Sequence, residues 1–356
     1  MGELRTTFLS DGEQPASVLA DTLCGWIDAA RVSLDIAIYD FDAMEGTTAR
    51  IGRAVEAAAG RGVAVRLAFN VEPTPGAETA RPMRADPTAV DALDVPTRGI
   101  ADTGSLMHHK YAIRDGRHVW TGSTNWTDDA FTREENIVVQ LDDVPDLAEA
   151  YTANFEHLWR HGHLERSGST GPETQVDRGV EVQPLFAPAP PWLSLAAARM
   201  IASADRRIRL CSPVVTSGVV LAALAEQVGR QKLELTGAYD HTQMDEVQDQ
   251  WSQVPHNRWK VAAWRTISPH LSGKVSTPYA PGALHDYMHA KALVVDDEIM
   301  TGSFNFSRHG DDNAENVLHL RNEEVALRFT AFIERVAARY RKAGPDTVVQ
   351  AAPTDD

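Results

Sequence analysis

Apolar and polar positions alternate in the same order along two stretches of the chain. The first starts near residue 29, where AARVSLDIAIYDF predicts a strand, ARIGRAVEAAAGRG a helix and VAVRLAFN a second strand. The second starts near residue 204, where ADRRIRLCSPVV, VVLAALAEQVGR and LELTGAYD repeat that order. Each stretch predicts a βαβ unit, so the chain contains an internal repeat.

The segments around each unit repeat as well. A helical segment precedes each unit, and a polar, proline-containing excursion follows it, at about residues 71–105 and 241–285. Each half ends in an amphipathic helix, with apolar stripes between Leu147 and Trp159 and between Val325 and Tyr340. These patterns predict an α/β protein of two similar lobes, each a mixed β-sheet flanked by helices.

The lobe boundaries follow from composition. Residues 161–182 are rich in Gly, Ser, Thr and charge and predict a linker. We therefore expect an N-terminal lobe at 1–160, a C-terminal lobe at 183–343 and a short disordered tail at 344–356.

The composition limits the cellular compartment and the binding partners that we expect. The two cysteines, Cys24 and Cys211, have neither the number nor the spacing of a disulfide framework or a metal site, which favours a reducing compartment. No signal-peptide pattern and no apolar run of roughly 18 residues is present, so we expect a cytoplasmic protein without a transmembrane segment. The net charge of −16 gives no general attraction to nucleic acid or to an anionic bilayer.

A polar motif occurs once in each half, as MHHKYAIRDGRHVWTGSTN from Met107 and as MHAKALVVDDEIMTGSFN from Met288. The shared residues are His108, Lys110, Asp115, Gly122, Ser123 and Asn125 in the first copy, and His289, Lys291, Asp296, Gly302, Ser303 and Asn305 in the second. Ten residues beyond each asparagine lie Glu135 and Glu315, which extends the match.

Each motif predicts a β-hairpin, because two apolar alternations flank a turn signal such as Asp115-Gly116. Side chains alternate across a strand, so His108 and Lys110 share one face and His109 lies on the other. Ala290 stands where His109 does, so the shared chemistry does not require His109. Asp115 and Asp296 end strands beside turns, and we expect a structural role for both.

The duplicated residue types suit phosphodiester chemistry. Two lysines with amide and hydroxyl donors stabilise the charge that grows on the phosphate oxygens during attack. One neutral imidazole can attack phosphorus while a second, protonated imidazole donates to the leaving oxygen. Glutamates on the far ring nitrogens would fix the tautomers. Two half-sites facing each other would supply all of these groups, so a monomer would suffice.

The paired HxKx4D…GSxN motifs resemble the HKD signature of the phospholipase D superfamily, over most of residues 8–342. The first copy fits HxKx4Dx6GSxN in full, whereas the second has five residues between Asp296 and Gly302, which we interpret as a shorter turn.

The resemblance implies a two-step reaction through a covalent phosphohistidine, without a metal or another cofactor. It implies His108 as the nucleophile and His289 as general acid and then base, although the symmetry of the sequence does not settle that order. Lys110, Lys291, Asn125 and Asn305 would bind the phosphate, and Ser123 and Ser303 would line the site. Glu135 and Glu315 would orient the histidines, and Gly122 and Gly302 belong to the structural part of the motif. Glu134 has Ala314 as its counterpart in this count, and we expect it to be a solvated charge.

Three functions remain open at this stage. The first is a phospholipase D-type enzyme that hydrolyses or transfers at a phospholipid head-group bond, with peripheral contact to a membrane. The second is an endonuclease or other nucleic-acid phosphodiesterase, which the acidity of the chain disfavours. The third is an inactive binding protein, which the intact motif residues disfavour. The excursions at 71–105 and 241–285 would select the substrate, and neither carries a recognisable signature.

Overall fold

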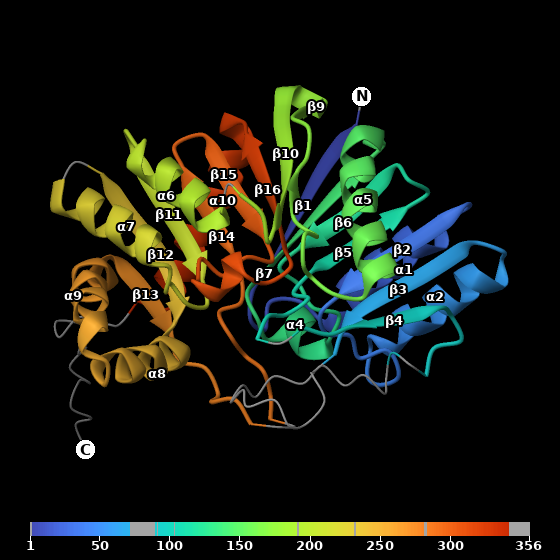
Figure 1. The fold of residues 1–356 in the computed structure, drawn as a ribbon, viewed down its shortest axis with the longest axis horizontal. Helices are drawn as coiled ribbons and strands as arrows, with labels where there is room; N and C mark the ends of the chain where they lie inside the picture. The colour runs from blue at the N-terminus through green and yellow to red at the C-terminus, as the bar shows by residue number, and fades with distance from the viewer. Residues whose placement is uncertain are drawn as a thin grey trace, which may run out of the picture.

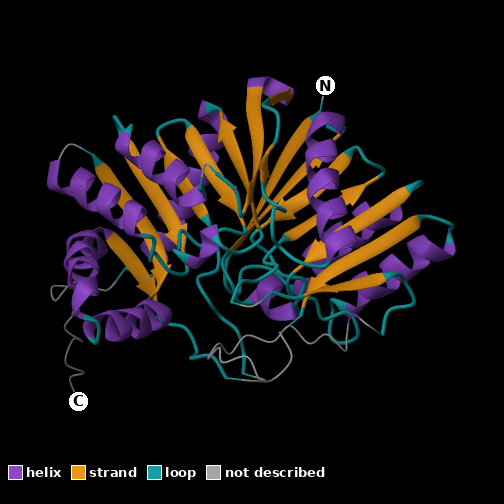
Figure 2. Cartoon of the chain, viewed as in Figure 1, coloured by secondary structure: helices purple, strands orange, loops and turns teal. Residues whose placement is uncertain are grey.

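The computed structural model describes residues 2–71, 90, 92–102, 104–190, 192–230, 233–280 and 283–341. Much of the first predicted excursion and the whole of the predicted tail lie outside these ranges. The described chain forms two mixed β-sheets side by side, with helices on their faces (Figures 1 and 2).

The first sheet has the strand order β1-β7-β6-β5-β2-β3-β4. Its strands are β1 Glu3–Leu9, β2 Ser33–Ile38, β3 Ala64–Asn70, β4 Thr97–Ile100, β5 Lys110–Arg114, β6 His118–Gly122 and β7 Asn136–Asp142. The helices of this half are α1 Ala16–Asp28, α2 Ala49–Gly60, α4 Asp128–Thr132 and α5 Pro145–His161. β2, β3 and β4 are parallel, and the remaining neighbours in the sheet are antiparallel.

The second sheet repeats this order as β10-β16-β15-β14-β11-β12-β13. Its strands are β10 Val180–Ala187, β11 Arg207–Ser212, β12 Glu234–Asp240, β13 Leu271–Lys274, β14 Ala292–Val295, β15 Glu298–Gly302 and β16 Glu315–Arg321. The helices are α6 Leu193–Ala202, α7 Gly218–Arg230, α8 His241–Ser252, α9 Arg258–Ile267 and α10 Glu323–Arg339, with 3₁₀ turns η1 Asp177–Gly179, η2 Pro255–Asn257, η3 Ser268–His270 and η4 His309–Asp311. The prediction of two similar α/β lobes is confirmed.

Two segments expected to be irregular contain regular structure. The predicted linker holds the short strands β8 Ser169–Thr170 and β9 Thr174–Val176 and the start of β10, all paired in the second sheet. The excursion at 241–285 contains α8, α9 and β13. Its few apolar side chains explain the error, because Trp251 and Trp264 are buried against the core while most of the surrounding residues are polar.

One apolar core continues across both lobes. It includes Leu147 and Phe155 of α5, Phe186 of β10 and Phe329 of α10. Phe8 of β1 packs its ring on Phe332 of α10, with 4.8 Å between the ring centroids. Because the lobes share this core, their sheets are held in a fixed relation, and single β-bridges join Met107 to Ala314 and Glu135 to Met288.

The motif aspartates fasten each hairpin to the neighbouring strand. Asp115 and Asp296 adopt positive φ angles of 54° and 53° at the hairpin turns. The Asp115 carboxylate accepts hydrogen bonds from the backbone N–H groups of residues 31, 32 and 33. The Asp296 carboxylate accepts from those of residues 205, 206 and 207. Both aspartates therefore hold the start of β2 or β11 against the hairpin, which is a structural contact.

The motif glycines allow a close approach of two backbones. Gly122 and Gly302 have φ angles of 138° and 154°. A Cβ atom at either position would lie 2.1 Å from a carbonyl oxygen, that of Ile137 or that of Asn316. Only glycine combines this φ with this contact.

Candidate active site

His108 is held by a carboxylate from the opposite lobe. Its Nδ1 atom lies 2.9 and 3.0 Å from the two carboxylate oxygens of Glu315, at the start of β16. The contact favours the tautomer with the proton on Nδ1, which leaves the Nε2 lone pair for another partner. Burial lowers the pKa of His108 to about 4, against the opposing effect of the Glu315 charge. His108 is therefore neutral at neutral pH.

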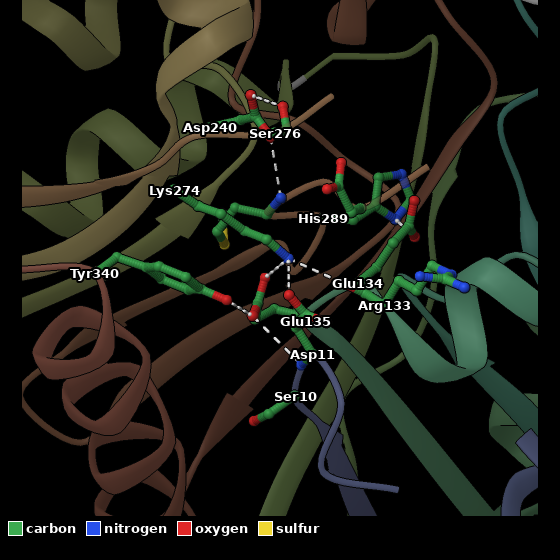
Figure 3. Close-up of polar contacts among 12 residues, drawn as sticks. Ser10, Asp11, Arg133, Glu134, Glu135, Asp240, Lys274, Ser276, His289 and Tyr340 are labelled. Atoms are coloured by element: carbon green, nitrogen blue, oxygen red, sulfur yellow. Dashed lines mark hydrogen bonds and ion pairs between the residues drawn. The ribbon is translucent and has the colours of Figure 1, made fainter. Parts of the chain in front are cut away.

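His289 has a different pair of partners. Its Nδ1 atom lies 3.1 Å from Oδ1 of Asn136. The same atom lies 3.3 Å from Oε2 of Glu134 (Figure 3). Glu134 is only 3% exposed, so the expectation of a solvated charge is wrong. The expectation that Glu135 orients a motif histidine is wrong as well, because the Glu135 carboxylate bonds Lys274 and Tyr340 instead.

A difference of one residue in loop length explains this error. The N–H of Ser123 bonds the carbonyl of Ile137, fourteen residues on, whereas the N–H of Ser303 bonds the carbonyl of Asn316, thirteen residues on. Asn136 therefore occupies the place of Glu315, and Glu134 occupies that of Asn313. The equal count of ten residues from each motif asparagine hid this shift, since the loops contain α4 in one half and η4 in the other.

The two motif lysines are buried, and each bonds a backbone carbonyl. Lys110 and Lys291 are 2% and 1% exposed, and each Nζ donates to the carbonyl of the motif histidine two residues earlier, at 2.8 and 2.6 Å. Neither makes an ion pair with any residue in the described ranges. Burial lowers the pKa of Lys110 to about 7, and burial together with the charge on Lys110 holds that of Lys291 well below its usual value. Two adjacent ammonium groups of this kind favour binding of an anion.

The polar residues of the GSxN runs divide into two kinds. Oδ1 of Asn125 and Oδ1 of Asn305 are buried and have no hydrogen-bond partner within the described structure. Ser123 and Ser303 are fully buried, and their hydroxyl groups donate to Asn136 and Glu315. The expectation that the serines line the phosphate site is therefore corrected: they hold the partners of the histidines.

Two residues at the ends of parallel strands hold the segments that carry the motif histidines. Oδ1 of Asn70, at the end of β3, accepts from the N–H of Met107 at 2.9 Å. Oδ2 of Asp240, at the end of β12, accepts from the N–H of Met288 at 3.0 Å. They occupy equivalent positions in the two sheets, but their residue types differ, so alignment of the two halves by residue type does not pair them.

Beneath His289 lies a buried ion pair that joins the lobes (Figure 3). Nζ of Lys274, at the end of β13, is 3.0 Å from Oε2 of Glu135 and 2.8 Å from the carbonyl of Arg133. The hydroxyl group of Tyr340 donates to the other oxygen of Glu135. The equivalent positions of the other half hold Ile100 and Ala314, which are apolar and buried.

Two kinds of feature are absent from the described part of the chain. No group of three or more histidine, cysteine or acidic side chains there is arranged to hold a metal ion. None of the described helices combines the length and the apolar composition of a membrane-spanning segment.

The fold and the paired half-sites define a two-lobed protein of the HKD type. A family model described as "Cardiolipin synthase, PLD-like domain" matches residues 23–159 and 197–337, one match in each lobe. The chain belongs to this family, within the phospholipase D superfamily.

Several known proteins are similar to this chain. The human protein named mitochondrial cardiolipin hydrolase is 32% identical over 155 residues, which cover 42% of this chain and 53% of that protein. Its Xenopus tropicalis counterpart is 35% identical over 133 residues, covering 37% and 56%. The chain thus spans about half the length of these relatives. The phosphatidylserine synthase structure from Haemophilus influenzae Rd KW20 is 12% identical, covers 94% of this chain and 86% of that one, and has a TM-score of 0.62, which shows the same fold across both lobes.

Proposed function

We propose that this protein cleaves or transfers at phospholipid phosphodiester bonds through a covalent phosphohistidine on His108. The observation that carries the proposal is the burial of Lys110 and Lys291 without ion pairs beside two imidazoles held by their Nδ1 atoms. This arrangement suits a phosphodiester anion. The name cardiolipin hydrolase, borne by the relatives, supports a phospholipid as the source of that diester.

The proposed reaction uses each group once in each of two steps. Nε2 of His108 attacks phosphorus, the bond from phosphorus to the leaving oxygen breaks, and His289 gives its Nε2 proton to that oxygen. A water molecule or an alcohol then attacks phosphorus, His289 takes the proton of that nucleophile, and the bond between phosphorus and His108 breaks. The ammonium groups of Lys110 and Lys291 stabilise the charge on the non-bridging oxygens in both steps.

The unequal partners of the histidines support the choice of His108 as nucleophile. His108 contacts both oxygens of a carboxylate, and a carboxylate on Nδ1–H increases the electron density at Nε2. The nearer contact of His289 is the amide oxygen of Asn136. This oxygen is uncharged, so it stabilises an imidazolium less than a carboxylate does. A less strongly stabilised imidazolium releases its proton more readily.

A parallel assay tests the proposal. Purified protein is incubated with cardiolipin vesicles, phosphatidylcholine vesicles, bis(p-nitrophenyl) phosphate and single-stranded DNA, with His108→Asn as the control and with an EDTA arm. We expect turnover of lipid and dye that survives EDTA and is lost in the variant. Cleavage of DNA without turnover of lipid would replace the phospholipid by a nucleic acid, and lipid turnover by the His108→Asn protein would reject the site.

The pKa values of the site predict the pH dependence of kcat/KM, which reports the free enzyme. His108 is neutral above about pH 4, and Lys110 keeps its proton below about pH 7. We therefore expect kcat/KM on bis(p-nitrophenyl) phosphate to fall as the pH rises through about 7. Bound phosphodiester favours the ammonium form, so the fall in kcat occurs at higher pH. In Lys110→Arg the alkaline fall should move to a different pH, because arginine stays charged and only Lys291 of the pair still loses its proton. A kcat/KM profile that is unchanged by this substitution would contradict the assignment.

A further inference from the structure

The two halves of the site contain the same hydrogen-bonded pair of side chains with acid and amide exchanged. In one half, Nδ2 of Asn313 donates to Glu315 at 3.1 Å. In the other half, Nδ2 of Asn136 donates to Glu134 at 3.0 Å. In each half a motif serine donates to the residue that begins the strand, Ser303 to Glu315 and Ser123 to Asn136. The two networks share the amide–carboxyl bond and the serine bond, with the places of glutamate and asparagine exchanged.

From this exchange we propose that Glu134, and not Glu135, is the carboxyl group that positions His289 for proton transfer. The inference deepens the proposed function and rests on it for the reaction. Glu134 and Glu135 are consecutive residues whose side chains point apart, Glu134 toward His289 and Glu135 toward Lys274 and Tyr340 (Figure 3). Each motif histidine thus has one carboxyl group from the opposite lobe. Glu315 contacts His108 directly. Glu134 lies 3.3 Å from His289 and is also bonded to the Asn136 amide, whose oxygen contacts the same ring nitrogen.

The buried surroundings favour the protonated form of the Glu134 carboxyl group. Burial raises the pKa of Glu134 to about 8 and holds the pKa of His289 well below its usual value. In the empty site the proton is therefore on Glu134 and the imidazole is neutral. The charged or titratable groups that act on this pair are Lys291, Lys110, Lys274, His108, His285 and Asp129. A phosphate anion at Nε2 favours the imidazolium, in which Nδ1–H bonds Oδ1 of Asn136 and lies 3.3 Å from Oε2 of Glu134. As His289 gains a proton on Nε2, Glu134 releases its own proton to solvent, and the resulting carboxylate stabilises the imidazolium.

Substitutions that follow the internal repeat test the inference. Glu134→Gln keeps the size of the side chain and removes the acid, and we expect kcat on bis(p-nitrophenyl) phosphate to fall by on the order of 10²-fold, with KM and the melting temperature little changed. Glu134→Asn should lose as much. The double variant Glu134→Asn/Asn136→Glu copies the arrangement of Asn313 and Glu315, and we expect it to recover kcat to within about tenfold of wild type.

A measurement on the imidazole itself separates this inference from the proposed function. ¹⁵N chemical shifts of His289 are recorded at pH 7 with and without inorganic phosphate. We expect phosphate to convert wild-type His289 from neutral imidazole to imidazolium, and to leave it neutral in Glu134→Gln. These shifts remain informative if no diester is hydrolysed by any form of the protein, an outcome that would reject the proposed function alone. Unchanged kcat in Glu134→Gln, or the same phosphate response in both proteins, would overturn the role of Glu134.

Discussion

His108→Asn is expected to abolish phosphodiester turnover, with kcat lower by on the order of 10⁴-fold or more, because the amide cannot form the covalent bond to phosphorus. Asparagine is similar in size and polar, so it should fit the buried space between Tyr39 and Glu315. The measurement is turnover of bis(p-nitrophenyl) phosphate together with a thermal melt that confirms folding.

A trapping experiment decides which histidine is the nucleophile. The p-nitrophenolate group leaves with little help from an acid, so His289→Asn should still be phosphorylated on His108 by a labelled aryl diester. Without His289 to activate water, the intermediate should accumulate. The label should be acid-labile and base-stable, and His108→Asn should carry none. Label on His289 in the His108→Asn protein would reverse the assigned order.

His109→Ala is the matched control for the His108 variant. His109 is fully buried, and its Nδ1 atom lies 3.2 Å from Oδ1 of Asn316, away from the His108–Glu315 pair. Ala290 occupies the equivalent place in the other half. We expect a lower melting temperature and a kcat close to wild type. Loss of turnover in a folded His109→Ala protein would contradict the argument from side-chain alternation, which places His108 in the active site and His109 on the opposite face of the strand.

Glu135→Ala and Lys274→Ile are each expected to lower the free energy of unfolding by about 3–5 kcal/mol. Glu135→Ala leaves the buried Lys274 ammonium with only the partly exposed Asp11 carboxylate, at 3.3 Å, and Lys274→Ile leaves the buried Glu135 carboxylate without a cation. Both side chains are at most 3% exposed, and their ion pair joins the two lobes. The measurement is the shift of the denaturation midpoint in urea, with the slope compared to detect any loss of cooperativity between the lobes.

The double variant Glu135→Ala/Lys274→Ile has a template within the chain, since Ala314 and Ile100 occupy these places in the other half. We expect it to recover at least about half of the loss of either single variant, because an apolar pair can replace a buried ion pair of similar volume. Losses in the double variant that equal the sum of the single losses would show that the two charges are not energetically coupled.

Much of the fold was predictable because its determinants are local. Strand alternation and helical periodicity placed β2, α2, β3 and their repeats β11, α7 and β12 within a few residues. The segment at 241–285 was missed because the stability of α8 and α9 depends on a few buried contacts, such as those of Trp251 and Trp264, rather than on a strong periodic pattern. The strands within the predicted linker were missed for a related reason: β8 and β9 are short and exist by pairing with β10.

By itself, the sequence determined the internal repeat, the two HKD motifs and the facing of His108 and Lys110 on one side of a strand, because periodicity and residue type carry that information. Only the tertiary structure decided which carboxyl group serves which histidine. Glu134, Glu135 and Asn136 are consecutive, and a shift of one residue along a strand turns a side chain to the opposite face. That register depends on the lengths of two loops and on contacts between residues more than a hundred positions apart, such as Glu135 with Lys274 and His289 with Asn136. Each half of the site is specified locally by its own motif, and the packing of the lobes against each other brings the two halves together.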